Sequence, residues 1–209
     1  RSSAASDVYK RQAADIALLA ELGVSDVAEN REQEARAKAA ELPQLRFHMI
    51  GQIQTKKANH VARWAASVHS LDSLKLAQAL ERGVALAKER GERESNLPVF
   101  VQVSADGDDA RGGVSRHALD ELVEAVEGSE HLDFAGLMVV PPLDADAGEV
   151  FRGVRDEVDR LSAALKRPLK LSAGMSADMA EAIAAGSDIV RVGTSIMAVS
   201  YTHLRAHET

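Results

Sequence analysis

The sequence predicts an α/β fold, a single (β/α)8 barrel of the TIM type, and three observations point to it. Short apolar runs alternate with longer amphipathic or Ala-rich runs along most of the 209 residues. Nothing between the predicted strands has the character of a hairpin turn, so the sheet is expected to be parallel. Seven strand segments can be counted, which favours a barrel over a doubly wound sheet, although the chain is short for a barrel.

Three strands and four helices are predicted in the first half of the chain. Each strand is a short apolar run, and most helices are bounded by a glycine, a proline or a capping hydroxyl residue. Ser73, for example, stands where it can cap the helix that follows it. The predicted strands are residues 24–28, 45–50 and 67–70, and the predicted helices are residues 13–22, 31–42, 55–66 and 74–88.

Four strands and three helices are predicted in the second half. Ser176 is expected to cap the last helix, and Gly186 is expected to end it. An eighth strand would have to precede Ala13, where Val8-Tyr9-Lys10 is the only candidate, so the first strand of the barrel is expected to be incomplete. The predicted strands are residues 98–104, 132–140, 171–173 and 188–192, and the predicted helices are residues 116–126, 147–165 and 177–185.

Composition excludes several classes of function. A net charge of −7 with acids spread along the chain argues against a nucleic-acid partner. The absence of cysteine excludes disulfides, thiolate metal sites and a cysteine nucleophile, and the histidines lack metal-binding spacing. No apolar run approaches the ~20 residues that span a bilayer, and no signal-peptide core is present at the start. We expect a cytoplasmic monomer without a membrane partner or a metal.

Polar and small residues gather where the predicted strands end. The carboxyl ends of parallel strands meet on one face of a barrel, where barrel enzymes build their sites, although loops are polar in any case. We therefore expect a functional site on this face. The residues at these strand ends are Asn30, His48, Gly51, Ser70, Ser104, Met138, Ser172, Ser176, Arg191, Gly193 and Thr194.

Residues 171–194 contain the most suggestive part of this face. Two successive strand ends carry a glycine and a hydroxyl residue, which suits a phosphate site and equally suits ordinary β/α turns. Arg191 is a permanent cation inside an apolar strand, so it needs an acidic partner or a ligand. His48 is either a catalytic base or a core histidine that is hydrogen-bonded to its surroundings.

Several of these segments together resemble one known family. Residues 48–57, HMIGQIQTKK, resemble the HxIGxLQxNK signature of the YggS/PROSC family of pyridoxal-phosphate homeostasis proteins, and residues 27–34, VAENREQE, resemble its FGENxxQE. Residues 136–138, 171–176 and 191–194 resemble its GLM, SxGMS and RIGT segments. The resemblance runs in order from about Ala13 to Met197, which predicts one cofactor-binding barrel domain over residues 13–197.

The resemblance implies a barrel like the N-terminal domain of alanine racemase that binds pyridoxal 5′-phosphate (PLP). The family holds PLP as a Schiff base to a lysine at the end of the first strand, where only Lys10 stands in this chain. Arg191 would face the pyridine nitrogen. The implied phosphate ligands are Ser176, Gly193 and Thr194, and the implied pocket residues are Asn30, His48, Met138 and Ser172.

The same resemblance favours a carrier or buffer of PLP over an enzyme. An arginine opposite the pyridine nitrogen weakens the cofactor as an electron sink, and racemases that tolerate this arginine need two positioned bases. In alanine racemase the second base is a tyrosine, whereas Tyr9 and Tyr201 of this chain lie in segments that do not match the family. A racemase-like enzyme and a module that binds phosphate ligands noncovalently are the alternatives. Residues 1–12 and 198–209 depart from the family pattern, as foreign terminal segments would.

Overall fold

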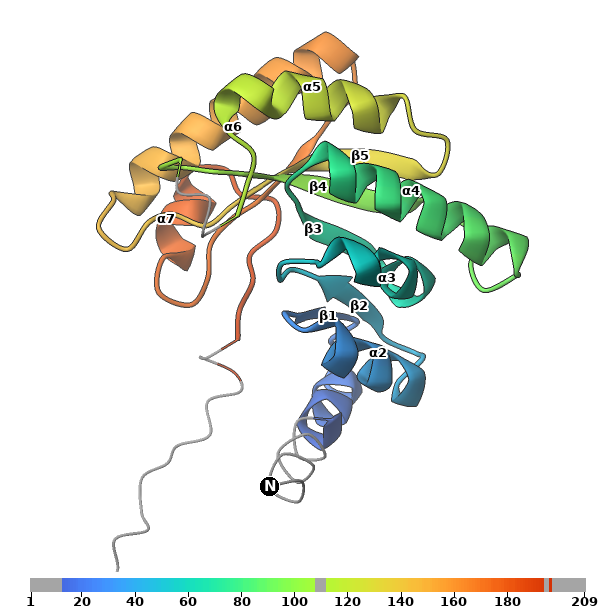
Figure 1. The fold of residues 1–209 in the computed structure, drawn as a ribbon. Helices are drawn as coiled ribbons and strands as arrows, with labels where there is room; N and C mark the ends of the chain where they lie inside the picture. The colour runs from blue at the N-terminus through green and yellow to red at the C-terminus, as the bar shows by residue number, and fades with distance from the viewer. Residues whose placement is uncertain (1–12, 108–111, 194–195, 197–209) are drawn as a thin grey trace, which may run out of the picture.

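A six-stranded parallel sheet forms the framework of the protein in a computed structural model, which describes residues 13–107, 112–193 and 196. The strands follow one another in chain order, and each pairs with its neighbours in sequence. The sheet curls, with the helices on its outer side (Figure 1). The strands are β1 (Asp26–Glu29), β2 (Arg46–Met49), β3 (Ser67–Leu71), β4 (Leu97–Val103), β5 (Leu132–Val139) and β6 (Lys170–Ser172).

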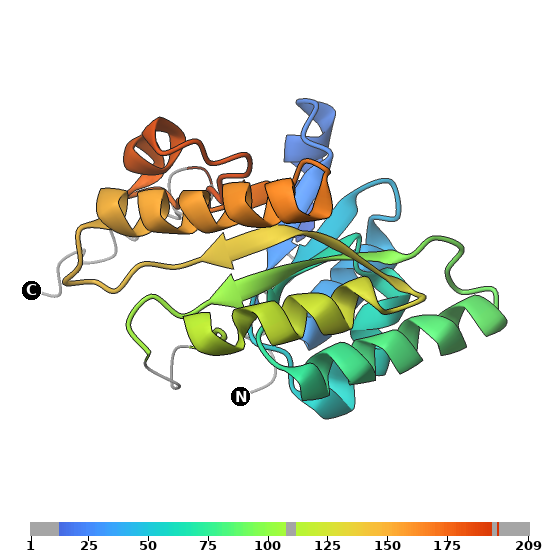
Figure 2. The ribbon, with the colours of Figure 1, turned by 90° about the horizontal axis from the view of Figure 1, so that it is seen from above.

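The helices alternate with the strands as predicted. Residues 13–21 form a helix ahead of β1, and α4, α5 and α6 run alongside β4 and β5 (Figure 2). The Ser73 hydroxyl caps α4 by accepting the Leu76 N–H at 3.4 Å. The helices are α2 (Glu32–Glu41), α3 (Ala58–Trp64) after the 3-10 turn η1 (Thr55–Lys57), α4 (Leu74–Glu89), α5 (Arg116–Glu127), α6 (Ala147–Leu165) and α7 (Met179–Ala184). None of the helices in the described ranges is long and apolar enough to cross a membrane.

The seventh predicted strand, residues 188–192, is wrong as a strand. It is reduced to an isolated parallel bridge between Ile189 and Ser172. Backbone bonds pair it with β6 at this bridge: the Ile189 N–H donates to the Leu171 carbonyl at 3.1 Å, and the Ala173 N–H donates to the Ile189 carbonyl at 3.0 Å. Side chains add to these bonds, since the Ser187 hydroxyl donates to the Ala173 carbonyl at 2.8 Å and the Asp188 carboxylate accepts the Leu171 N–H at 2.7 Å. These bonds still anchor the segment beside β6.

The expected helix cap at Ser176 is also wrong. Residues 176–178 form a turn, so the helix begins later and Asp178 stands at the N-cap position without a capping side-chain bond. The Asp178 carboxylate instead accepts the Met175 N–H at 2.6 Å, which holds the turn. The other end is as predicted, because Gly186 follows α7 with a φ of +83°.

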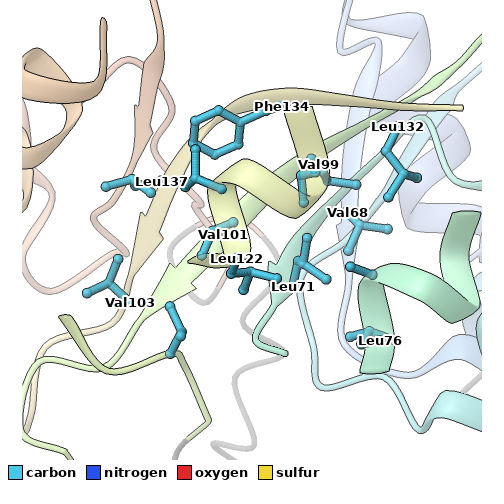
Figure 3. Packing of buried hydrophobic residues seen from close by; sticks show 14 of the residues in the cluster. Val68, Leu71, Leu76, Val99, Val101, Val103, Leu122, Leu132, Phe134 and Leu137 are labelled. Atoms are coloured by element: carbon cyan, nitrogen blue, oxygen red, sulfur yellow. The ribbon is translucent and has the colours of Figure 1, made fainter. Parts of the chain in front are cut away.

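Side chains alternate along the strands between a helix-covered outer face and the interior. In β4, Val99, Val101 and Val103 belong to the apolar core between sheet and helices, where Leu122 of α5 lies among them (Figure 3). Phe100, between them, lines the interior cavity instead. This two-residue period decides which side chains can meet inside the curled sheet.

The loops after β1 and β2 are in close contact at Gly51. A Cβ atom at this position would lie 2.0 Å from the Asn30 carbonyl oxygen, so only glycine fits. The Gly51 carbonyl in turn accepts the Ser70 hydroxyl at 2.6 Å. Gly51 therefore holds the strand ends of β1, β2 and β3 together.

We expect Gly51→Ala to lower the free energy of unfolding by about 2–3 kcal/mol, because the new methyl group must push two backbones apart. Gly91→Ala is the matched control: it has open space but a φ of +68°, and it should cost only about 1 kcal/mol. Urea unfolding of the two variants measures the difference. Equal losses would show that the close approach at Gly51 relaxes freely.

Candidate functional site

A cavity of about 630 Å³ lies inside the curled sheet. Its wall is formed by inward-facing side chains of the strands and by the segment that bridges to β6. Apolar residues such as Phe100 and Ile189 share this wall with polar ones. The polar residues that line it include Asp26, Arg46, His48, Ser67, His69 and Arg191.

Five hydrogen bonds join six side chains across the interior into one chain, which we call the interior relay. It begins on the segment after the bridge, crosses β6, β3 and β2, and ends on β1. The order is Arg191, Ser172, His69, Ser67, His48 and Asp26.

The first half of the interior relay is the more deeply buried. Arg191 donates from Nη1 to the Ser172 hydroxyl at 2.9 Å, and this hydroxyl lies 2.8 Å from Nδ1 of His69. Nε2 of His69 lies 2.8 Å from the Ser67 hydroxyl. Ser172 is completely buried and His69 is 3% exposed, so these polar groups depend on one another for hydrogen bonds.

The second half reaches toward the surface. Nδ1 of His48 lies 2.7 Å from the Ser67 hydroxyl, and Nε2 lies 2.8 Å from Oδ1 of Asp26. Burial alone would raise the pKa of Asp26, but hydrogen bonds from Ser25, Arg46 and His48 lower this pKa to about 2. Asp26 is therefore a carboxylate at neutral pH.

Burial controls the charge of the two most interior basic groups. It lowers the pKa of His69 to about 3, with smaller contributions from His48 and Arg191, so His69 is neutral at pH 7. Burial also lowers the pKa of Arg191, to about 10, against the opposing effect of Asp178. Arg191 still carries its charge at neutral pH.

The hydrogen-bond partners of Arg191 are neutral in the part of the chain that the structure describes. Besides Ser172, its side chain donates from Nη2 to the Val139 carbonyl at 3.1 Å. Two of its five N–H groups are used in this way. The expected acidic residue is present in Asp178, which favours the charged form of the guanidinium, and the expectation of a ligand stays a prediction.

The interior relay brings together three of the nine predicted site residues: His48, Ser172 and Arg191. Met138, on β5, is 2% exposed and lines a smaller cavity of about 180 Å³ with Gln102 and Ser104. Asn30 lines a different cavity, of about 570 Å³, beside Gln52 and Lys57.

The remaining predicted residues lie in loops at the carboxyl end of the sheet or outside the described part. Ser176 is half-buried in the turn before α7, and Gly193 is exposed, with open space where a Cβ would stand. Lys10 and Thr194 lie outside the described residues. No group of three or more metal-binding side chains is found among the described residues.

Sequence reasoning missed Asp26, Ser67 and His69. A signal for two of them existed, since Ser67 and His69 are two apart in a strand that is buried along its whole length. Polar residues at i and i+2 of a buried strand share one face and must find partners there. The partner of His69, Ser172, is 103 residues away in the sequence, and no local sequence pattern identifies it.

Acidification is expected to destabilise the protein through His69. Between its folded pKa of about 3 and the ordinary 6.5, the unfolded chain binds a proton that the folded protein does not. The free energy of unfolding therefore falls as pH falls through this window, by up to about 1.4 kcal/mol per pH unit. Urea unfolding from about pH 6.5 to 5 should show ~2 kcal/mol more loss in the wild type than in His69→Asn. If the free energies of unfolding of the wild type and of His69→Asn fell equally with pH, a neutral His69 would be contradicted.

Comparisons with known proteins agree on one family. The family described as alanine racemase, N-terminal domain, matches residues 6–200. The pyridoxal phosphate homeostasis protein of Corynebacterium glutamicum is 55% identical over 184 residues, which cover 88% of this chain and 83% of the relative. That of Mycobacterium tuberculosis is 44% identical over 200 residues, covering 88% and 78%.

Solved structures agree with this result. PipY of Synechococcus elongatus, crystallised with PLP bound, is 33% identical, with a TM-score of 0.78 over 88% of this chain and 86% of that one. Alanine racemase of Clostridium difficile, at 18% identity, has a TM-score of 0.65 over 96% of this chain and 51% of its own, which shows a shared fold. The predicted barrel class is thereby confirmed. The chain belongs to the YggS/PROSC family of pyridoxal phosphate homeostasis proteins, which has the barrel of the alanine racemase N-terminal domain.

Proposed function

We propose that the protein binds PLP and acts in PLP homeostasis as a carrier or buffer of the cofactor, without turnover of its own. The observation that carries the proposal is the position of Arg191, which lines the interior cavity and donates a hydrogen bond to the buried Ser172. These are two of the residues that the family resemblance assigns to PLP. The related PipY, which binds PLP in its crystal structure, supports the same function.

The residues present fit the cofactor. Arg191 lines the cavity of about 630 Å³, which is within the usual size range for small-molecule sites and extends to Asp26, Arg46 and Lys170, the first residues of β1, β2 and β6. Ser172, Ser176 and Gly193 lie outside its lining. Arg191 retains N–H groups beyond those bound to Ser172 and Val139, and an unprotonated pyridine nitrogen is an acceptor for one of them. The exposed Gly193 allows close approach of a phosphate group to the backbone. Ser176, Thr194 and Lys10 stay predictions as phosphate ligands and PLP lysine.

The charges of the interior favour carriage over catalysis. Bound PLP supplies an aldehyde and an electron-withdrawing ring, which is strongest when the ring nitrogen is protonated. Arg191 keeps its own proton at neutral pH and so offers the ring nitrogen a hydrogen bond without transferring a proton. His69, with a pKa of about 3, is too weak a base to abstract a proton from an amino acid at neutral pH.

The direct test is an absorbance spectrum of the purified protein titrated with PLP, before and after borohydride. We expect a PLP band that shifts from that of the free cofactor, and covalent attachment at Lys10 after reduction. Binding that is unaffected by Lys10→Ala and leaves no adduct would favour the noncovalent phosphate module. Exchange of the α-hydrogen of alanine or serine at useful rates would overturn the non-catalytic role.

Arg191→Gln is expected to raise the Kd for PLP by about tenfold or more, because it removes a charged donor from the ring site. Arg160→Gln is a matched control, since Arg160 is an exposed cation on α6 that pairs with Asp120 and Glu157. It should leave the Kd unchanged. Equal affinities of both variants and the wild type would remove Arg191 from the PLP site.

A further inference from the structure

The two ends of the interior relay fix the direction of its hydrogen bonds. Arg191 can only donate, because a guanidinium has no acceptor. Asp26 can only accept, because its low pKa keeps it a carboxylate at neutral pH. The interior side chains between these ends must therefore accept on the side of Arg191 and donate on the side of Asp26.

This direction determines the tautomers of both histidines. A neutral His48 must place its proton on Nε2 to donate to Asp26, so its Nδ1 accepts the Ser67 hydroxyl proton. With that proton committed, the Ser67 oxygen accepts from Nε2 of His69. Nδ1 of His69 then accepts from the Ser172 hydroxyl.

The opposite direction leaves groups unsatisfied. If His69 carried its proton on Nδ1, the Ser172 oxygen would accept from both His69 and Arg191, and its own proton would lose its partner. At the other end, a neutral His48 would turn a bare Nε2 toward the Asp26 carboxylate. An unsatisfied buried hydroxyl and two facing lone pairs both carry a penalty.

We propose that His69 is a positioning residue: it accepts the Ser172 hydroxyl proton and so keeps the Ser172 oxygen turned toward Arg191, with the interior relay running in one direction to Asp26. His69 is suited to this role because it is buried, neutral and contacts Phe100, whose ring centroid lies 4.3 Å from its own. Its effect on PLP, through Arg191, rests on the proposed function.

Other charged groups around the interior relay are compatible with this direction. Arg46, on β2, donates to the second carboxylate oxygen of Asp26 at 2.6 Å and leaves Oδ1 to His48. The His48 and His69 rings meet edge to face with their centroids 5.8 Å apart, so a charge on both rings at once is disfavoured. Asp178 acts on Arg191 from the start of α7 and favours its charged form.

The first test needs no cofactor. Long-range 1H–15N spectra of the 15N-labelled protein at about pH 8, where an ordinary histidine is neutral, report the proton position on each ring. We expect His48 and His69 both to be protonated on Nε2 alone. A proton on Nδ1 of His69 would overturn the proposed direction.

The second test separates positioning from packing. In His69→Asn the amide oxygen stands near the place of Nδ1 and can still accept from Ser172, whereas in His69→Gln the amide lies near the place of Nε2 and meets only Ser67. We expect His69→Gln to weaken PLP binding by about tenfold and His69→Asn to stay within about threefold of the wild type. His117→Gln, on the exposed side of α5, is the control and should change nothing.

The outcomes distinguish this inference from the proposed function. If the wild type does not bind PLP, the proposed function fails, and the ring spectra still decide the direction of the interior relay. If the wild type binds PLP and the two His69 variants lose affinity equally, or neither loses any, His69 does not position Arg191. Should His69→Gln fail to fold, the spectra of the wild type and of His69→Asn remain decisive.

Discussion

The alternation of side chains along each strand is the constraint on which the rest of the structure depends. A curled sheet covered by helices has one apolar face and one face turned inward, and every second residue must suit the inside. In β2 and β3 the inward residues include the half-buried His48 and the buried Ser67 and His69. They are compatible with folding because β6 and the segment after it supply Ser172 and Arg191 as partners.

Much of the fold could be predicted because its signals are local. The helix over residues 147–165 has the predicted bounds, since its apolar period is regular and the Asp146 carboxylate caps its start. The errors arose where pairing is too short to make a strand. Residues 188–192 have the composition of a strand, but their backbone bonds to β6 amount to a single bridge at Ile189, which the side chains of Ser187 and Asp188 supplement, and no propensity reports how far a ladder extends.

The residues of the candidate site likewise differ in whether a local sequence signal identifies them. Arg191 and Ser172 could be found from the sequence because they stand at the ends of predicted strands within recognisable segments. For His69 the sequence offered only its spacing from Ser67 in a buried strand, because its partner Ser172 lies on β6, which faces it only in the folded protein. The resemblance to a family also gave no reason to expect that Asp26, on the first described strand, would end a chain of bonds from Arg191.

The sequential order of the strands has a consequence for how the protein is made. Each unit docks on the one before it, so a growing chain can add strands in the order of synthesis, with contacts between segments close in sequence. The bond between His69 and Ser172 is an exception, since it spans 103 residues. During synthesis, β4, β5 and α6 are made after His69 and before its partner, Ser172. A nascent chain that stops short of β6 has a sheet without a finished interior, and the ability to bind a ligand there coincides with completion of the chain through Arg191.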